Sequence, residues 1–228
     1  MNKADQPVTL VDDYYRDPTP DIEPGAICWG PSLYLVEGLS ALRVQYVEPG
    51  NEKNVLLKLV SSRDTKLFDH EPIKHPPVRK TEEFLTVKAK VRGLIVLSLR
   101  SDPVEGRFGG YGFPESHVVA PIYTFRAGET REEGEEDYDP EFVERVKYFV
   151  YHQFFYLPAS DHYGIRESFA RFDRVQVVAR RNLDRPQVRL TLNALTVLRD
   201  LLTYYLTGVP EQNIEDVRRD YMKAKGLA

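Results

Sequence analysis

The strongest constraint on the fold is an almost unbroken apolar run, GLIVLSL, at residues 93–99. Apolar residues at nearly every position, rather than at every second one, indicate a strand that is buried on both faces. Such a strand needs other strands beside it and side chains packed above and below it. The run therefore predicts the central strand of a sheet.

Shorter β-type runs flank this strand in the sequence. ALRVQYV and NVLLKLV, at 41–47 and 54–60, are joined by a loop that contains Pro49 and Gly50, which predicts a hairpin. The run HVVAPIYTF contains Pro121, which has no backbone N–H, so an edge, a bulge or a break is expected there. Residues 168–178 are typical of a short, half-buried strand.

Helical patterns occupy the C-terminal half. Asp139 followed by Pro140 is typical of an N-cap and a first helical residue, and predicts a helix over 140–155. Apolar residues at helical spacing predict a second helix over 190–206, ended by Gly208. Pro210 is expected to begin a last, polar helix. Together these patterns indicate an α+β protein, either a mostly antiparallel sheet with helices or a small barrel.

Composition limits the function. The 228 residues are 42% hydrophobic and 29% charged, so the chain can bury a core without disulfides or metal. The net charge of −4 means that nucleic-acid binding has to use a local patch. The single cysteine, Cys28, points to a reducing compartment, which predicts the cytoplasm. No apolar stretch has the length of a membrane-spanning helix, so a soluble protein without a membrane partner is expected.

No cofactor is predicted. The glycine-rich loop EGRFGGYGF lacks the lysine and hydroxyl residue of a phosphate-binding loop. His70 and His75 lie in a proline-rich segment without a regular element to fix a metal geometry, so no metal site is expected. Cys28 is expected to be a buried, inert thiol, and His117 to be exposed or capped.

The order of the strands and one motif carry a family resemblance. A strand that opens PGAICW is followed by VRGLIVLS, then by VVAPIYT, and then by YGIRESFARFDRVQVVARRNL before an apolar helix. This order resembles the MazF/PemK-like toxin endoribonucleases, over about half of the chain. The strongest piece has five residues at matching intervals, namely Ser168, Asp173, Val175, Arg180 and Leu183.

The resemblance implies a small SH3-like antiparallel β-barrel with packed C-terminal helices. It divides the chain into an extended N-terminal arm at 1–24, a barrel at 25–208 and a C-terminal helix at 209–228. Insertions relative to the family are expected at about 31–90 and 126–156. The implied function is a metal-independent endoribonuclease of toxin–antitoxin type that cleaves single-stranded RNA. An antitoxin protein and a second copy of the chain are the implied protein partners.

Such cleavage uses the ribose 2′-OH as the attacking group and needs a cation for the charge that develops on the phosphate. Arg92, just before the central strand, is the candidate for this role, although a solvated arginine at a strand start would look the same. Tyr123 stands where the family has its catalytic threonine, and Thr124 follows it. A slip of one residue turns a side chain to the other face, so Thr124 can replace that threonine only if Pro121 bulges the strand.

The candidates for RNA binding are three cations and one aromatic residue, namely Lys88, Lys90, Arg174 and Tyr111. Arg171 and Arg174 are three residues apart, so in a regular strand they point to opposite faces. A basic edge is expected from four further arginines, namely Arg180, Arg181, Arg185 and Arg189. Either an acidic partner or the acidic segment 129–141 of the same chain could pair with this edge.

A second function class stays open. The chain could be a catalytically inactive barrel that binds nucleic acid or protein, since a fold alone does not carry an activity. Tyr123 in place of threonine favours this alternative. Arg92 and the spacing within 163–183 favour the nuclease.

Overall fold

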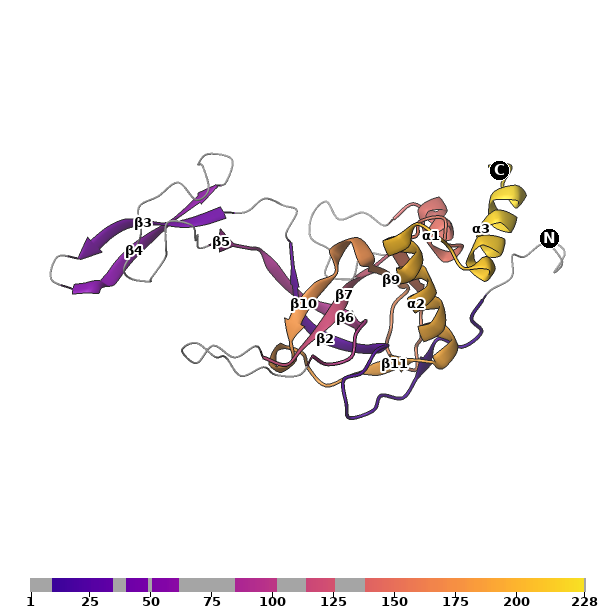
Figure 1. Ribbon diagram of the computed structural model, residues 1–228, viewed down its shortest axis with the longest axis horizontal. Coiled ribbons are helices and arrows are strands. Elements are labelled where there is room, and N and C mark those ends of the chain that lie inside the picture. Colours follow the sequence, from indigo (N-terminus) through magenta and orange to yellow (C-terminus); the bar gives the residue numbers. More distant parts are fainter. Residues whose placement is uncertain are drawn as a thin grey trace. The chain divides into compact units, whose positions relative to one another are not determined.

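The computed structural model describes residues 10–34, 40–48, 51–61, 85–101, 114–125 and 138–227 (Figure 1). The chain divides into two compact units, Met1–Ser32 with Val91–Ala228, and Leu33–Lys90. The second unit spans nearly the same residues as the insertion expected at about 31–90.

The first unit is built on one sheet with three helices. Its elements are, in chain order, β1 (Tyr15–Arg16), β2 (Ala26–Leu33), β6 (Ala89–Val96), β7 (Ser116–Thr124), α1 (Pro140–Lys147), β8 (Phe154–Leu157), β9 (Ser168–Arg171), β10 (Gln176–Ala179), β11 (Val188–Leu190), α2 (Leu192–Thr207) and α3 (Gln212–Ala224). Two short 3₁₀ helices, η2 (Phe172–Arg174) and η3 (Arg180–Asn182), flank β10. The predicted α+β class is confirmed.

The main sheet is an open one in the described part of the chain. Its strand order is β1-β11-β2-β6-β7-β9-β8, with β10 added beside β7. The pairs β1–β11, β11–β2, β6–β7, β7–β9, β7–β10 and β8–β9 are antiparallel. No pairing among these strands closes them into a ring, so the closed SH3-like barrel is not confirmed.

The second unit contains the predicted hairpin. β3 (Ser40–Glu48) and β4 (Asn51–Ser61) pair in antiparallel register, and β5 (Leu85–Thr86) pairs with the other edge of β3. In the chain, this unit follows β2 and precedes β6. Tyr111 and the loop around it, like His70 and His75, lie outside the described residues.

β6 is the predicted central strand, buried on both faces. Leu94, Ile95 and Val96 are each 0% exposed, whereas Leu99 at the end of the run is 75% exposed. Leu94 and Val96 pack with Cys28 and Val119, while Ile95 packs into the main core on the other face. Two clusters on opposite faces explain why this segment has no polar position.

β7 is interior to the sheet despite Pro121. Leu94 lies opposite Pro121 on the β6 side, and the ladder with β6 has no shift of register. On the other edge, β10 pairs with residues 116–119 and β9 with residues 122–124. Successive residues of a strand direct their backbone groups to alternate edges, and Pro121 faces the edge where η2 separates β9 from β10. The break expected from Pro121 thus occurs not in β7 but in the segment that pairs with it. For this reason the single strand predicted over 168–178 is two short strands, β9 and β10.

α2 covers one face of the sheet, as its apolar spacing predicted (Figure 1). Leu195, Leu198 and Leu201 are 5%, 0% and 0% exposed. The Thr191 side chain caps its first turn by accepting from the Ala194 N–H at 3.3 Å. Gly208 ends it at φ +74°, a left-handed backbone that favours glycine.

α1 is shorter than predicted. Asp139 caps it and Pro140 begins it, as expected, but it ends at Lys147 instead of residue 155, and residues 154–157 form β8. The reason is a Schellman motif, in which the Val150 N–H donates to the Arg145 carbonyl and the Phe149 N–H to the Val146 carbonyl. Phe149 adopts φ +58° at the position where glycine is usual.

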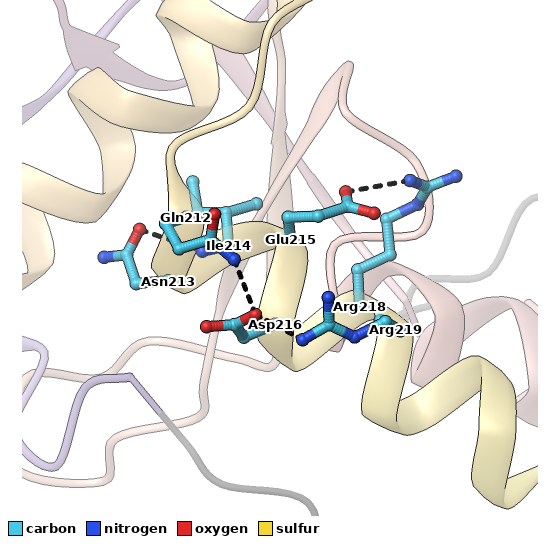
Figure 2. A network of polar contacts seen from close by, with 7 residues as sticks. All are labelled: Gln212, Asn213, Ile214, Glu215, Asp216, Arg218 and Arg219. Carbon is cyan, nitrogen blue, oxygen red and sulfur yellow. Dashed lines mark hydrogen bonds and ion pairs between the residues drawn. The ribbon is translucent and has the colours of Figure 1, made fainter.

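α3 is the predicted last helix, begun two residues after Pro210. It buries Ile214, Val217 and Tyr221 against the first unit. Its outer face carries ion pairs and hydrogen bonds along the helix itself, which Figure 2 shows. Gln212 donates to Asp216 at 2.8 Å, and Arg218 pairs with Glu215 at 3.0 Å.

Candidate functional site

The register of β6 against β7 brings two of the predicted catalytic residues together. Leu94 lies opposite Pro121, so continuation of the same ladder places Arg92 opposite Tyr123 on one face of the sheet. The guanidinium carbon of Arg92 is 4.1 Å from the centroid of the Tyr123 ring. This is a cation–π contact, which holds the positive charge at a fixed place beside the phenol.

β9 adds a second arginine to the same tyrosine. Arg171 Cζ is 5.3 Å from the Tyr123 ring centroid and 5.6 Å from that of Phe154. Phe169, which lies opposite Tyr123 in β9, stacks on the Tyr123 ring with the centroids 5.9 Å apart. Tyr123 therefore has aromatic and cationic neighbours from two strands.

η2 supplies the only carboxylate within this group among the described residues. Arg171 donates to Asp173 through Nε at 3.0 Å and through Nη2 at 2.5 Å. Arg174 Nε is 3.8 Å from Asp173 Oδ2. The hydrogen bond to Asp173 raises the pKa of Arg171 above its ordinary value, so this guanidinium stays charged. We name Arg92, Tyr123, Arg171, Asp173 and Arg174 the Arg–Tyr cluster.

The 3₁₀ turn explains why Asp173 reaches back to Arg171. Phe172 is 2% exposed and packs in the main core, and its N–H donates to the Gln153 carbonyl at 2.9 Å. The Val175 N–H donates to the Phe172 carbonyl, which closes the turn. In a regular strand Arg171 and Arg174 would lie on opposite faces, as the sequence predicted. That prediction is wrong because the turn interrupts the alternation, and both arginines approach Asp173.

The cluster gathers several positively charged side chains. Arg171 and Arg174 share the Asp173 carboxylate, Arg92 adds a third guanidinium on the Tyr123 ring, and Arg171, Asp173 and Arg174 have partly exposed side chains. The chain as a whole is acidic, so this is the kind of local basic patch that anion binding would require. Exposed guanidiniums on aromatic rings can bind phosphate oxygens and stack on bases.

The other predicted site residues within the described ranges are Thr124, Lys88 and Lys90. β7 shows no shift of register against β6 or β9, so Pro121 makes no bulge and Thr124 faces away from Tyr123. Lys90 is in β6, two residues before Arg92 and at the boundary between the two units, and Lys88 precedes that strand, with its Nζ 5.4 Å from the Tyr34 ring centroid. The structure therefore joins Arg92, Tyr123 and Arg174 and leaves Thr124 on the opposite face. Sequence reasoning missed Arg171 and Asp173 as members, because Arg171 reaches Tyr123 through the pairing of β9 with β7 and Asp173 reaches Arg171 only through the turn.

One of the four arginines of the expected basic edge has a local partner. Arg189 pairs with Glu23 at 2.5 Å, which is a contact within the first unit. Asp139, the described end of the acidic segment, instead caps α1 through Oδ1, which accepts from the Glu141 N–H at 2.9 Å. Arg189 and Asp139 therefore each contact a neighbouring group within the first unit, and not each other.

Two potentially reactive side chains are sealed in the core. Cys28 is 0% exposed, and burial raises the pKa of its thiol to about 11, so it stays protonated and unreactive. His117 is 1% exposed, and burial lowers its pKa, so it stays neutral. The expectation that His117 is exposed or capped is wrong, because its side chain points to the same face as the buried Val119.

Comparison of the chain with protein-family models, with curated proteins and with solved structures found no match. Within the described ranges, no three His, Cys, Asp or Glu side chains are grouped so that they could hold a metal ion. In the same part of the chain, none of the helices is both long and apolar enough to cross a membrane.

Proposed function

We propose that this protein is a MazF/PemK-like endoribonuclease that cleaves single-stranded RNA without a metal. The observation that carries the proposal is the contact between Arg92 and Tyr123, with the guanidinium carbon 4.1 Å from the ring centroid. It places a permanent cation against the ring of a tyrosine, whose hydroxyl can donate a proton, on a partly exposed face of the sheet. Phosphodiester cleavage by an internal hydroxyl needs both kinds of group.

In this proposal the substrate supplies the nucleophile. The ribose 2′ oxygen attacks the adjacent phosphorus and loses its proton, the bond from phosphorus to the 5′ oxygen breaks, and that oxygen gains a proton. The products are a 2′,3′-cyclic phosphate and a 5′-hydroxyl. Arg92 holds the charge on the phosphate oxygens through its planar fork, Tyr123 donates its hydroxyl proton to the leaving 5′ oxygen, and water accepts the proton of the 2′-hydroxyl. Arg171 positions the Tyr123 ring.

The strand connections support the proposed barrel-like curvature. β10 pairs with β7, continues through η3 and leads to β11, which pairs with β2. This segment therefore joins the two edges of the β2–β6–β7 group. Gln176 in β10 donates through Nε2 to the Pro31 carbonyl in β2 at 2.5 Å, so the two edges also meet through a side chain. A cytoplasmic location, an antitoxin that covers the Arg–Tyr cluster and a homodimer complete the proposal.

The test is cleavage of a panel of single-stranded RNAs by the purified chain in the presence of EDTA. We expect products that end in a 2′,3′-cyclic phosphate, and no cleavage of DNA of the same sequence, which lacks the attacking hydroxyl. Cleavage that requires added metal, or that leaves a linear 3′-hydroxyl, would contradict this mechanism.

A second candidate is a binding module for single-stranded nucleic acid. It is favoured by the placement of Thr124, because the hydroxyl next to Tyr123 faces away from the cluster. Arg–aromatic stacking binds bases and phosphates without any proton transfer. Salt-dependent RNA binding without cleavage over the whole panel would select this candidate. Absence of both binding and cleavage would leave a protein partner as the remaining function.

A further inference from the structure

A pocket of about 310 Å³ lies away from the Arg–Tyr cluster, within the first unit. It is formed where the N-terminal segment passes the end of α1, β8 and α3. Its lining includes apolar and polar side chains, among them Val11, Tyr14, Lys147, Tyr148, Phe149 and Val217. Small-molecule sites begin at roughly this volume, about 300 Å³, and combine an apolar lining with a few polar groups.

Lys147 supplies a cation to this pocket. Its Nζ atom is 5.8 Å from the ring centroids of both Tyr148 and Tyr156. In the part of the chain that the structure describes, no carboxylate forms an ion pair with it. Lys147 lies in the last turn of α1, where the helix dipole favours a cation. The dipole explains why a charged residue is favourable at this position, but it does not explain the cavity beside it.

Tyr14 supplies a hydrogen-bond donor. Its ring packs against Phe155 and Tyr156, and among the described residues its hydroxyl has no hydrogen-bond partner. Burial raises the pKa of Tyr14 to about 12, so the hydroxyl keeps its proton at neutral pH. The Tyr156 hydroxyl, by contrast, is already used, since it donates to Glu167 Oε1 at 2.6 Å. Lys147 and Tyr14 are thus among the donors left to a ligand.

The backbone at Phe149 shapes the wall of the pocket. Its left-handed φ of +58° is unfavourable for a residue with a side chain, by roughly 1 kcal/mol. The conformation persists with the ring 3% exposed and packed in the main core. Because the chain turns sharply here, three consecutive residues, 147–149, line the same pocket, which a continued helix would prevent.

The charged side chains that line the pocket favour a ligand with a single negative charge. Asp12, an exposed carboxylate, also lines the pocket, so a doubly charged phosphate would be opposed more strongly than a monoanion. Apolar walls and tyrosine rings favour a flat hydrocarbon body. We propose that this pocket binds a small organic monocarboxylate, with its carboxylate on Lys147 and Tyr14 and its apolar body against Val11, Phe149 and Val217.

The experiment uses the full chain and benzoate as the probe, with binding followed by calorimetry and by ligand-observed NMR. We expect benzoate to bind at millimolar concentrations or below, and benzamide, which has the same shape without the charge, to bind more weakly. Phenyl phosphate should also bind more weakly than benzoate. Equal binding of benzoate and benzamide would overturn the proposal, as would no binding of benzoate at millimolar concentrations.

Two variants locate the binding. Lys147→Met keeps the length of the side chain and removes its charge, and should weaken benzoate binding about tenfold, the scale of one charge-assisted hydrogen bond. Tyr14→Phe removes only the hydroxyl and should weaken it by a smaller factor. Lys223→Met, on an exposed position of α3, is the matched control and should leave binding unchanged. Equal effects of Lys147→Met and Lys223→Met would overturn the assignment, and circular dichroism of each variant checks its folding.

Discussion

The two faces of the main sheet differ in the side chains that they bury. The face under α2 is mostly aliphatic, with Ile95, Leu190, Leu198 and Leu201 each 0% exposed. The opposite face carries a smaller aliphatic cluster around Leu94 and Val96 and, near α1, an aromatic cluster in which Phe125, Tyr156 and Phe169 are buried. The Arg–Tyr cluster adjoins these rings, and Arg171 contacts Phe154 at their margin.

This difference separates stability from chemistry. An aliphatic layer excludes water and offers no charged or hydrogen-bonding group to a substrate. Aromatic rings also exclude water, but their faces attract cations, so guanidiniums can lie against the edge of the aromatic cluster. We therefore expect substitutions on the two faces to have separable effects.

The largest expected effect is on the α2 face. Leu198→Ala should lower the free energy of unfolding by about 2–4 kcal/mol, because it removes buried methyl groups and leaves a cavity. Urea denaturation measures the change. Leu206→Ala on the same helix is the control, since Leu206 is 71% exposed and its loss should change stability by less than about 0.5 kcal/mol. Similar losses in both variants would contradict the assignment of α2 to the core.

The next effect is on the opposite face. Arg92→Ala should lower the rate of RNA cleavage by about 100-fold, the scale of one lost charge contact in a transition state, with little change in stability. Arg92→Lys should restore only part of the rate, because an ammonium lacks the planar fork. Arg199→Ala, an exposed arginine on α2, is the matched control and should cleave normally. Equal losses in Arg92→Ala and Arg199→Ala would show that the cluster is not the site.

A smaller effect is expected at the end of α2. Gly208→Ala should lower the free energy of unfolding by about 1 kcal/mol, because alanine is strained at φ +74°. No atom lies within 4 Å of the added Cβ, so the cost is one of backbone conformation alone. Thermal unfolding of the variant measures it. A destabilisation as large as that of Leu198→Ala would mean that the glycine has a packing role.

The smallest expected effect is a pH dependence of the free energy of unfolding, which is absent at neutral pH and is due to His117. This residue shares a face of β7 with Tyr123 but is buried. Burial lowers its pKa from 6.5, and Arg180, Arg100 and Glu115 are the charged groups that influence it. Because the unfolded chain then binds a proton that the folded chain does not, the free energy of unfolding should be at its full value above pH 6.5. It should fall as the pH drops from there toward the lowered pKa.

Unfolding curves at a series of pH values test this dependence. His117→Leu removes the titrating group, so its stability should change less between pH 7 and pH 5 than that of the unchanged chain. The same slope in both proteins would assign the acid sensitivity to other groups.

Much of the fold followed from local patterns in the sequence. Three successive apolar residues of β6 face two cores, so an unbroken run was the only pattern that the strand could have. The limits of α2 were set by Thr191 and Gly208, whose capping preferences are local. The end of α1 could not be found in this way, because Phe149 adopts a conformation that its own residue type disfavours and that the core enforces.

The site followed only in part. Arg92 and Tyr123 were predicted, although their contact depends on the register between strands far apart in the sequence. Arg171 and Asp173 were missed, because their pairing requires η2, and the burial of Phe172 that fixes this turn is a tertiary effect. Thr124 faces away from the cluster because β7 has no bulge at Pro121. The presence of a proline in the sequence does not by itself predict whether a strand bulges.

The hydrogen bond between the Tyr34 N–H and the Lys88 carbonyl, 2.8 Å long, has a consequence for how this chain can be rearranged. It holds the entry and the exit of the second unit beside each other. A graft of a different hairpin between these two positions would therefore leave the ends of β2 and β6 at the separation that they already have. Residues 34 and 88 are therefore natural crossover points for recombination. The segment between them can be exchanged as a whole without a change in the strand order of the main sheet.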